Sequence, residues 1–164
     1  EPVSVVHEMT ALQHELDRAG RFPVLRFLRP RLPGGEPSVI PVVNNLTASR
    51  VLTAKALGVA DHRHCAAEFA RRSAAAIQPS IVERADAPVQ QVVLQGEAAD
   101  LTRLPVLTQH ELEPGRYLTA AHATTCDPDT LTDNTAIQRC WVMGPRRMSW
   151  MAYPASHNAR NLRK

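Results

Sequence analysis

The chain has 164 residues, enough for one domain or for one small domain and part of another. Hydrophobic residues make up 44% of it, too many for a disordered chain, whereas aromatic residues make up 4%, so a core must rest on Val, Leu, Ile and Ala. The net charge of +3 arises from arginines scattered among acidic residues. This pattern indicates a mixed solvated surface, and we expect no nucleic-acid partner.

The three cysteines, Cys65, Cys126 and Cys140, are odd in number and show no CxxC spacing. Free thiols are typical of a reducing compartment, so we expect a cytoplasmic protein. Cys126 and Cys140 either face each other across a hairpin or act as small hydrophobic groups, the simpler interpretation. No apolar stretch is long enough to span a membrane, and no signal-peptide pattern is recognised.

The first 80 residues predict a mixed α/β domain. An amphipathic helix is expected first, then two short apolar strands around a loop rich in proline and glycine, then two more capped helices. Glycines end the first two of these helices. The expected elements are a helix within residues 4–21 that ends at Gly20, strands within 22–30 and 39–46, a helix over 47–58 with Thr47 as N-cap and Gly58 at its end, and a helix over 61–76 with Asp61 as N-cap.

Residues 81–164 predict the start of an antiparallel β domain. A connector that contains prolines leads into it, and turns rich in Asp, Pro, Thr and Gly separate the later strands. Because so few strands bury little surface, we expect the chain to be the front part of something larger. Strands are expected at 89–97, 116–127, 134–144 and 146–154, with residues 100–107 extended and a helix beginning within 156–164.

Two polar residues in the expected strand over residues 134–144 stand out. Arg139 has apolar residues on both sides, which predicts a buried guanidinium with an anionic partner, either a ligand or a structural salt bridge. Asn134, at the strand's start, serves either the backbone or a site. The two are five residues apart and point to opposite faces, so one shared site requires a bulge, a twist or a ligand that wraps the strand end.

Other candidate residues give a weaker indication of function. His62 and His64, beside Cys65, are two positions apart, and a helix does not bring such residues together, so they are expected to be surface or capping histidines. The sequence contains no GxGxxG, P-loop, GxSxG or HExxH motif.

Several spaced motifs, in order, resemble those of the UbiD family of decarboxylases that use prenylated flavin mononucleotide (prFMN). They are "VVNNLTASRVLTAKALGV" at residues 42–59, "PVQQVVLQGEAADLTRLP" at 88–105, "GRYLT" at 115–119, "DP" at 127–128 and "NTAIQR" at 134–139. The resemblance covers nearly all of the chain. It implies an N-terminal α/β domain over residues 1–80, then the first part of a split β-barrel that binds flavin over residues 81–164.

The resemblance also implies roles for individual residues. Asn134 and His157 match ligands of a divalent metal, with Mn²⁺ expected and K⁺ as a further ion, that bridges the cofactor phosphate. Arg139 matches the catalytic arginine that fixes the substrate carboxylate. The positions that match prFMN-binding residues are Ala136, Ile137, Gln138, Arg139, Met151, Ala152, Tyr153, Ser156 and His157.

The implied reaction is reversible, non-oxidative decarboxylation of an aromatic or α,β-unsaturated carboxylic acid. A flavin prenyltransferase would supply the cofactor, and the complete enzyme would be a homodimer or larger homo-oligomer. The family's catalytic acids should lie well beyond Arg139, yet no acidic residue follows Asp133. By itself the chain is therefore expected to be inactive, and Glu111 and Glu113, on a loop before the strand, are poor substitutes.

Two alternatives remain open. One is a non-catalytic fragment or split subunit that binds the cofactor phosphate or a partner chain, as unpaired strand edges would allow. The other is a split-barrel flavin oxidoreductase.

Overall fold

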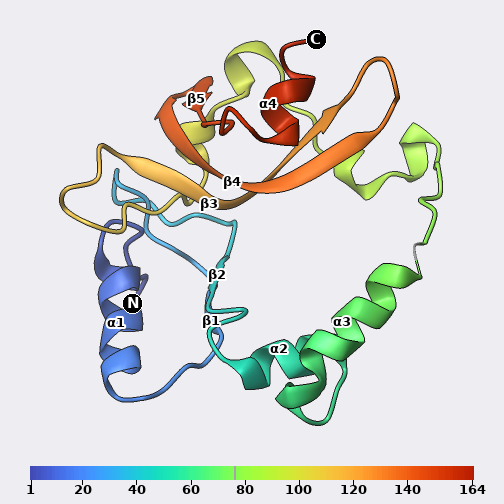
Figure 1. Cartoon of the computed structure of the whole chain (residues 1–164). Helices are drawn as coiled ribbons and strands as arrows, with labels where there is room; N and C mark the ends of the chain where they lie inside the picture. The colour runs from blue at the N-terminus through green and yellow to red at the C-terminus, as the bar shows by residue number, and fades with distance from the viewer. Residues whose placement is uncertain (76) are drawn as a thin grey trace.

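Figure 1 shows the chain as a computed structural model, which describes residues 1–75 and 77–164. Helices and antiparallel sheets alternate along it, so the predicted α+β class is confirmed. One sheet pairs β1 (Leu25–Phe27) with β2 (Val42–Asn44), and the other joins β3 (Arg116–Cys126), β4 (Asp133–Gly144) and β5 (Arg147–Ser149). The helices are α1 (Glu8–Arg18), α2 (Arg50–Leu57), α3 (Cys65–Ala74) and α4 (His157–Asn161).

A small apolar core holds the N-terminal part together. Val5, Met9 and Val42 are buried there, so α1 and β2 share one cluster. Residue Leu107, from the second half of the chain, packs against the same cluster. The backbone N–H of Thr108 donates to the Val5 carbonyl oxygen over 3.1 Å, which ties the two halves together beside this core.

The expected caps are correct at one helix and wrong at another. Asp61 accepts a hydrogen bond from the backbone N–H of Arg63 over 2.8 Å and begins a short 3₁₀ turn that leads into α3. The last residue of that expected helix, 76, lies outside the described residues. The N-cap of α2 is Ser49 rather than Thr47, because the Ser49 hydroxyl lies three residues before the Leu52 N–H that it accepts. Gly58 ends α2 in the left-handed region, as predicted.

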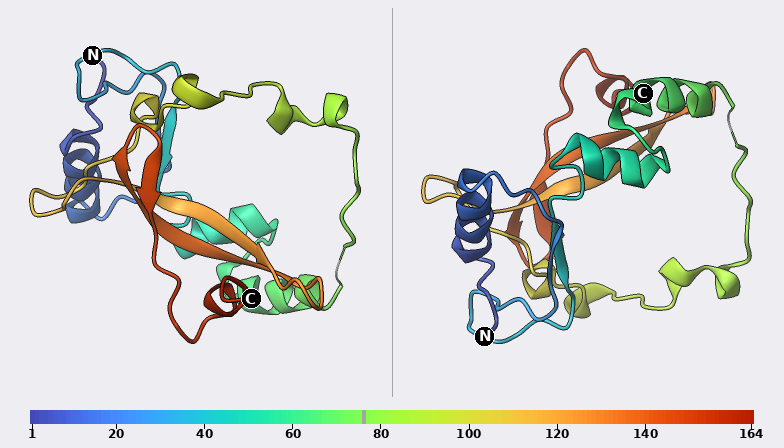
Figure 2. Two further views of the ribbon diagram at one scale, coloured as in Figure 1. Left: turned by 90° about the horizontal axis from the view of Figure 1, so that it is seen from above. Right: turned by 90° about the horizontal axis from the view of Figure 1, so that it is seen from below.

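The expected strand over residues 89–97 is wrong. Two 3₁₀ turns, Pro88–Gln90 and Gly96–Ala98, lie there instead. Proline donates no backbone hydrogen bond and Gly96 has a φ of 56°, so both ends of the apolar run leave the extended region. The run itself finds no strand partner among the described residues. Both views of Figure 2 show this segment passing round the outside of the molecule.

The extended conformation expected for residues 100–107 is found only in part. A 3₁₀ turn occupies Leu101–Arg103, capped by Asp100, and Leu107 then forms a bridge with Tyr117 of β3.

Strands β3 and β4 form the predicted hairpin, and they are the longest elements of the second half among the described residues. Its register places His122 opposite Ile137 and Thr125 opposite Asn134, and a β-bulge interrupts β3 between Leu118 and Ala121. Strand β5 is shorter than the predicted strand over 146–154, and α4 begins where a helix was expected. The described strands form open sheets, not a closed barrel.

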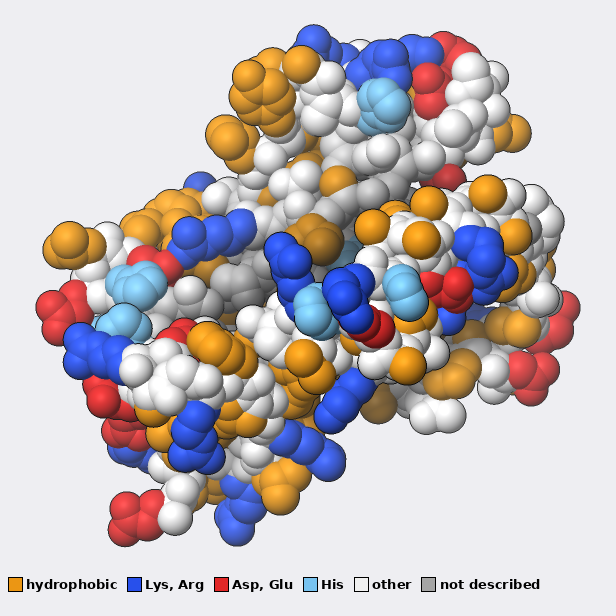
Figure 3. Space-filling model, turned by 60° about the horizontal axis from the view of Figure 1, so that its bottom comes forward, with side chains coloured by type: hydrophobic (Ala, Val, Ile, Leu, Met, Phe, Trp, Pro, Cys, Tyr) orange, Lys and Arg blue, Asp and Glu red, His pale blue; other side chains and the backbone are white. Residues whose placement is uncertain are grey.

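The mixed surface matches the prediction, whereas the simpler prediction for the cysteines holds for one of the two. In β3 and β4, Cys126 lies opposite Asp133 and Cys140 opposite Leu118, so the two thiols do not face each other. Cys140 is buried as a small apolar group, as predicted, but Cys126 is exposed, contrary to the prediction. On the face in Figure 3, basic, acidic and hydrophobic side chains are interspersed. None of the described helices has the length and apolar character needed to cross a membrane.

Candidate cofactor and metal site

Strand β4 presents two different faces, which we name by one residue each. The Asn134 face carries Asn134, Ala136 and Gln138, and α4 packs against it (Figure 1). The Arg139 face carries Ile137 and Arg139. The pairing of β3 with β4 is regular from Ala121 to Cys126, and the bulge inserts its extra residue into β3, so alternation in β4 is unbroken from Asn134 to Arg139. Asn134 and Arg139 therefore lie on opposite faces.

A pocket of about 340 Å³ lies where α4 meets the start of β4. Its lining joins the β3–β4 turn to the polar side of α4. Both predicted metal ligands, Asn134 and His157, line it, so the structure brings these two residues to one place. The lining residues are Asp127, Thr130, Thr132, Asp133, Asn134, His157, Arg160 and Asn161.

The donors in this pocket fit part of the coordination set of a hard divalent cation. The amino group of Asn134 donates to Asn158, while no hydrogen bond within the described residues reaches the amide oxygen of Asn134. The imidazole of His157 likewise forms no hydrogen bond there. No group of three or more His, Cys, Asp or Glu side chains gathers into a metal site in the described part of the chain. The two predicted ligands thus offer one amide oxygen and one imidazole, and further ligands must complete a site.

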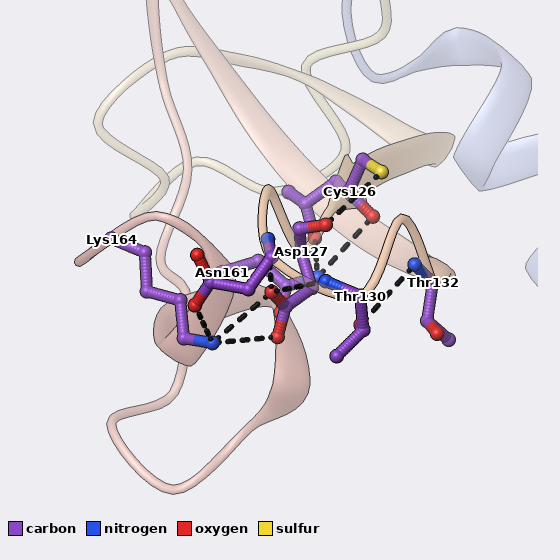
Figure 4. A network of polar contacts seen from close by, with 8 residues as sticks. Cys126, Asp127, Thr130, Thr132, Asn161 and Lys164 are labelled. Atoms are coloured by element: carbon purple, nitrogen blue, oxygen red, sulfur yellow. Dashed lines mark hydrogen bonds and ion pairs between the residues drawn. The ribbon is translucent and has the colours of Figure 1, made fainter.

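The β3–β4 turn that lines one part of the pocket is held by a network of polar contacts (Figure 4). Lys164 donates to Asp127 over 3.0 Å and to Asp129 over 2.8 Å. Asp127 also accepts from the backbone N–H groups of Asp129 and Thr130, which closes the turn. The hydrogen bond from Lys164, followed by that from the Asp129 N–H, holds the pKa of the Asp127 carboxyl below its ordinary value. This acid is therefore occupied in a structural network.

Ser156 has a capping role in the structure. Its hydroxyl accepts the backbone N–H of Ala159 over 3.1 Å and so begins α4. The cap places His157 at the first helical position, beside the pocket.

On the opposite face, Arg139 is not buried, contrary to the prediction. Its side chain is 52% exposed and pairs with Glu113, the loop residue that the sequence argument set aside. The guanidinium carbon lies 4.0 Å from the centre of the Tyr117 ring, a cation–π arrangement. Of the two outcomes expected for Arg139, the described residues contain the salt bridge.

Glu113 is held in place by its own loop. Its carboxylate accepts the backbone N–H of Gln109 over 2.8 Å and that of His110 over 3.4 Å. Partial burial raises the pKa of the Glu113 carboxyl, but these two hydrogen bonds and the charge of Arg139 leave that pKa below its ordinary value. The structure therefore places an ionised carboxylate directly on the predicted catalytic arginine.

The other predicted cofactor residues do not converge in the described chain. Ile137 is 71% exposed on the Arg139 face, while Ala136 and Gln138 lie on the Asn134 face. Met151 and Tyr153 are 73% and 67% exposed, beyond the end of β5, and Ala152 between them is half-buried. These side chains leave a surface that a cofactor or further protein can cover.

Sequence reasoning missed the residues that surround the two predicted ligands. Thr125, Asn158 and Asn161 form a hydrogen-bonded chain behind Asn134, and Arg160 lines the pocket. The helical spacing of Asn158 and Asn161 was a usable signal, because residues three apart lie on one side of a helix.

Solved structures share this fold. At 30% identity, the UbiD-class enzyme HmfF from Pelotomaculum thermopropionicum, determined with prFMN, aligns over 94% of this chain and 34% of its own, with a TM-score of 0.80. Vanillic acid decarboxylase from Sedimentibacter hydroxybenzoicus aligns at 23% identity over 100% of this chain and 36% of its own, with a TM-score of 0.83. 3,4-Dihydroxybenzoic acid decarboxylase from Klebsiella pneumoniae aligns at 20% identity over 96% of this chain and 33% of its own, with a TM-score of 0.79. The last two likenesses show the fold alone.

Two family models account for the sequence. The N-terminal domain of 3-octaprenyl-4-hydroxybenzoate carboxy-lyase matches residues 1–72, and the Rift-related domain of the same carboxy-lyase matches residues 80–164. The chain therefore belongs to the UbiD family. It spans about a third of the length of the solved structures that it matches. A search of the curated proteins found no match.

Proposed function

We propose that this chain forms the N-terminal part of a prFMN-dependent carboxy-lyase that reversibly decarboxylates an aromatic or α,β-unsaturated carboxylic acid. The observation that carries the proposal is the shared pocket of Asn134 and His157, since the family resemblance assigns these two residues to one metal. Family membership and the prFMN complex of HmfF support the choice of cofactor. We also propose a domain boundary near residue 80, in keeping with the two family matches.

In this proposal, the amide oxygen of Asn134 and the imidazole of His157 hold a divalent cation, Mn²⁺, that neutralises the cofactor phosphate, with K⁺ as a further ion. Oxygen and imidazole donors suit such a cation. When bound, the cofactor supplies the electron sink that decarboxylation needs. Ala136, Ile137, Gln138, Met151, Ala152, Tyr153 and Ser156 would line its binding site.

Arg139 would bind the substrate carboxylate. Its planar guanidinium donates two parallel hydrogen bonds to a carboxylate and stays charged throughout the reaction. The pairing with Glu113 supports this role, because it shows that a carboxylate can reach the guanidinium while Tyr117 covers the other side. In the complete enzyme a substrate must compete with Glu113 for Arg139.

The acid that protonates the product carbon, and a further metal ligand, would come from sequence beyond residue 164. A flavin prenyltransferase would supply the cofactor, and the enzyme would assemble as a homodimer or larger homo-oligomer. The three cysteines are free thiols, which supports a cytoplasmic location.

The test is to express the complete enzyme with and without a flavin prenyltransferase. We expect bound flavin absorbance and Mn²⁺ after co-expression, and release of CO₂ from at least one acid in a panel of phenolic, heteroaromatic and acrylic acids. Without the prenyltransferase, CO₂ release should be lost. A purified protein with an intact mass near 18.1 kDa, no flavin and no CO₂ release would overturn the proposal and favour a non-catalytic or split subunit.

A further inference from the structure

A chain of hydrogen bonds runs from α4 through β3 to Asn134. Asn161 donates to the backbone carbonyl oxygen of Thr125 over 3.3 Å and to the Thr125 hydroxyl over 3.1 Å. The Thr125 hydroxyl donates to the side-chain oxygen of Asn158 over 3.0 Å. The same Asn158 oxygen accepts the amino group of Asn134. Four side chains are thus connected, and the pocket lies at the Asn134 end.

One end of this chain is fixed by a backbone group. A carbonyl oxygen can only accept, so Asn161 must turn its amino group toward Thr125. The Thr125 hydroxyl accepts from that amino group, which leaves its hydrogen for Asn158. The side-chain oxygen of Asn158 accepts that hydrogen, and the amino group of Asn134 donates to the same oxygen.

The hydrogen bond to Asn158 determines which end of the Asn134 amide is free in the pocket. When the amino group of Asn134 is held by Asn158, the oxygen is the end of the amide left for a ligand. Burial strengthens this constraint, because Asn158 is 1% exposed and water cannot replace its partners. The amino group of Asn158 is buried without a partner within the described residues. Leaving that amino group unpaired is costly, and the two hydrogen bonds that the Asn158 oxygen accepts from Thr125 and Asn134 offset this cost.

We infer that Thr125, Asn158 and Asn161 are positioning residues that orient the Asn134 amide so that its oxygen faces the metal. This inference rests on the proposed function, in which Asn134 is a metal ligand. Partners behind a ligand change metal affinity by about 10- to 100-fold when they are removed. None of the three needs to touch the metal for this effect.

The experiment measures Mn²⁺ binding to the complete enzyme in the presence of FMN, from the loss of the free Mn²⁺ electron paramagnetic resonance signal. Thr125→Val removes the hydroxyl with little change in shape, and we expect about 10-fold weaker binding. Thr125→Ser keeps the hydroxyl and should bind as the unsubstituted enzyme does. Thr124→Val is the matched control, because the Thr124 hydroxyl pairs with Thr135 on the other face. Its Mn²⁺ affinity should not change.

Two variants of Asn158 test the same point. Asn158→Leu removes the shared acceptor and should weaken Mn²⁺ binding by about 10- to 100-fold. Asn158→Asp keeps the acceptor oxygens and should retain the affinity. A merely structural role would lower the thermal midpoint of Thr125→Val and Thr124→Val alike and leave the Mn²⁺ affinity unchanged.

A double substitution separates this inference from the proposed function. If Thr125 acts through Asn134, Thr125→Val should have no further effect in an Asn134→Ala background. Equal weakening in both backgrounds, or no weakening in either, would overturn the inference while leaving the metal site intact, provided that Asn134→Ala alone weakens binding. If Asn134→Ala alone leaves Mn²⁺ affinity unchanged, the proposed metal site fails and this inference fails with it.

Discussion

The two faces of β4 differ in how many packing and hydrogen-bond contacts the described chain makes with them. On the Asn134 face, α4 covers the strand and a buried amide connects three elements through side-chain hydrogen bonds. On the Arg139 face, Ile137 and Arg139 are exposed, and one loop carboxylate provides the ionic partner. The comparison shows that local packing fixes the side chains of the proposed metal-binding face, while the face proposed to bind substrate remains exposed. Each prediction below tests that separation.

The largest effect is expected on the Asn134 face. Asn134→Ala combined with His157→Ala should weaken Mn²⁺ binding in the complete enzyme by more than about 100-fold, since the loss of supporting residues alone costs about 10- to 100-fold. Bound flavin and CO₂ release should fall with the metal. Metal analysis and flavin absorbance measure this, with Thr135→Ala on the exposed face as the control. Unchanged metal and flavin content would remove the metal assignment.

The next effect is expected on the Arg139 face. Arg139→Ala should lower the decarboxylation rate by about 10²- to 10³-fold, because a preorganised charge that orients the carboxylate is lost. Mn²⁺ content should stay near normal, since Arg139 lies on the other side of β4 from the pocket of Asn134 and His157. Steady-state CO₂ release measures the rate, and Arg147→Ala on exposed β5 is the matched control. A rate near that of the unsubstituted enzyme would contradict the role of Arg139, and a loss of metal would contradict the separation of the faces.

A smaller effect is expected at Glu113. Glu113→Gln removes the negative charge that competes with substrate for Arg139, so KM should fall a few-fold while kcat changes little. Steady-state kinetics measures both, and Glu111→Gln, on the same exposed loop, is the control. A lower kcat with unchanged KM would instead give Glu113 a part in the chemical step.

The smallest effect is expected on the way the free energy of unfolding varies with pH. The pKa of Glu113 is lowered in the folded state, so its stabilising contribution is complete above its ordinary value of 4.5 and is lost as pH falls through the lowered value. Because Arg139 is half exposed, the difference in unfolding free energy should stay below about 1 kcal/mol. Urea unfolding of the enzyme and of Glu113→Gln should differ near neutral pH and converge in acid. A constant difference across that range would show that the ion pair does not contribute.

The sequence by itself determined the local periodicities and the order of motifs. Helical spacing predicted α1, alternation predicted β3 and β4, and the odd separation of Asn134 and Arg139 predicted opposite faces. These features depend on neighbouring residues and on the two-residue repeat of a strand, which the sequence carries directly. The spaced motifs also identified the family, which the two family matches confirm.

Only the tertiary structure decided which distant side chains meet. The docking of α4 places His157 on the pocket of Asn134 and connects Asn158 to it, and the loop at Glu113 reaches Arg139 from 26 residues away. The apolar run at 89–97 failed as a strand because a strand needs a partner as well as apolar residues. Long-range pairing depends on how elements pack in three dimensions, and no local pattern encodes it.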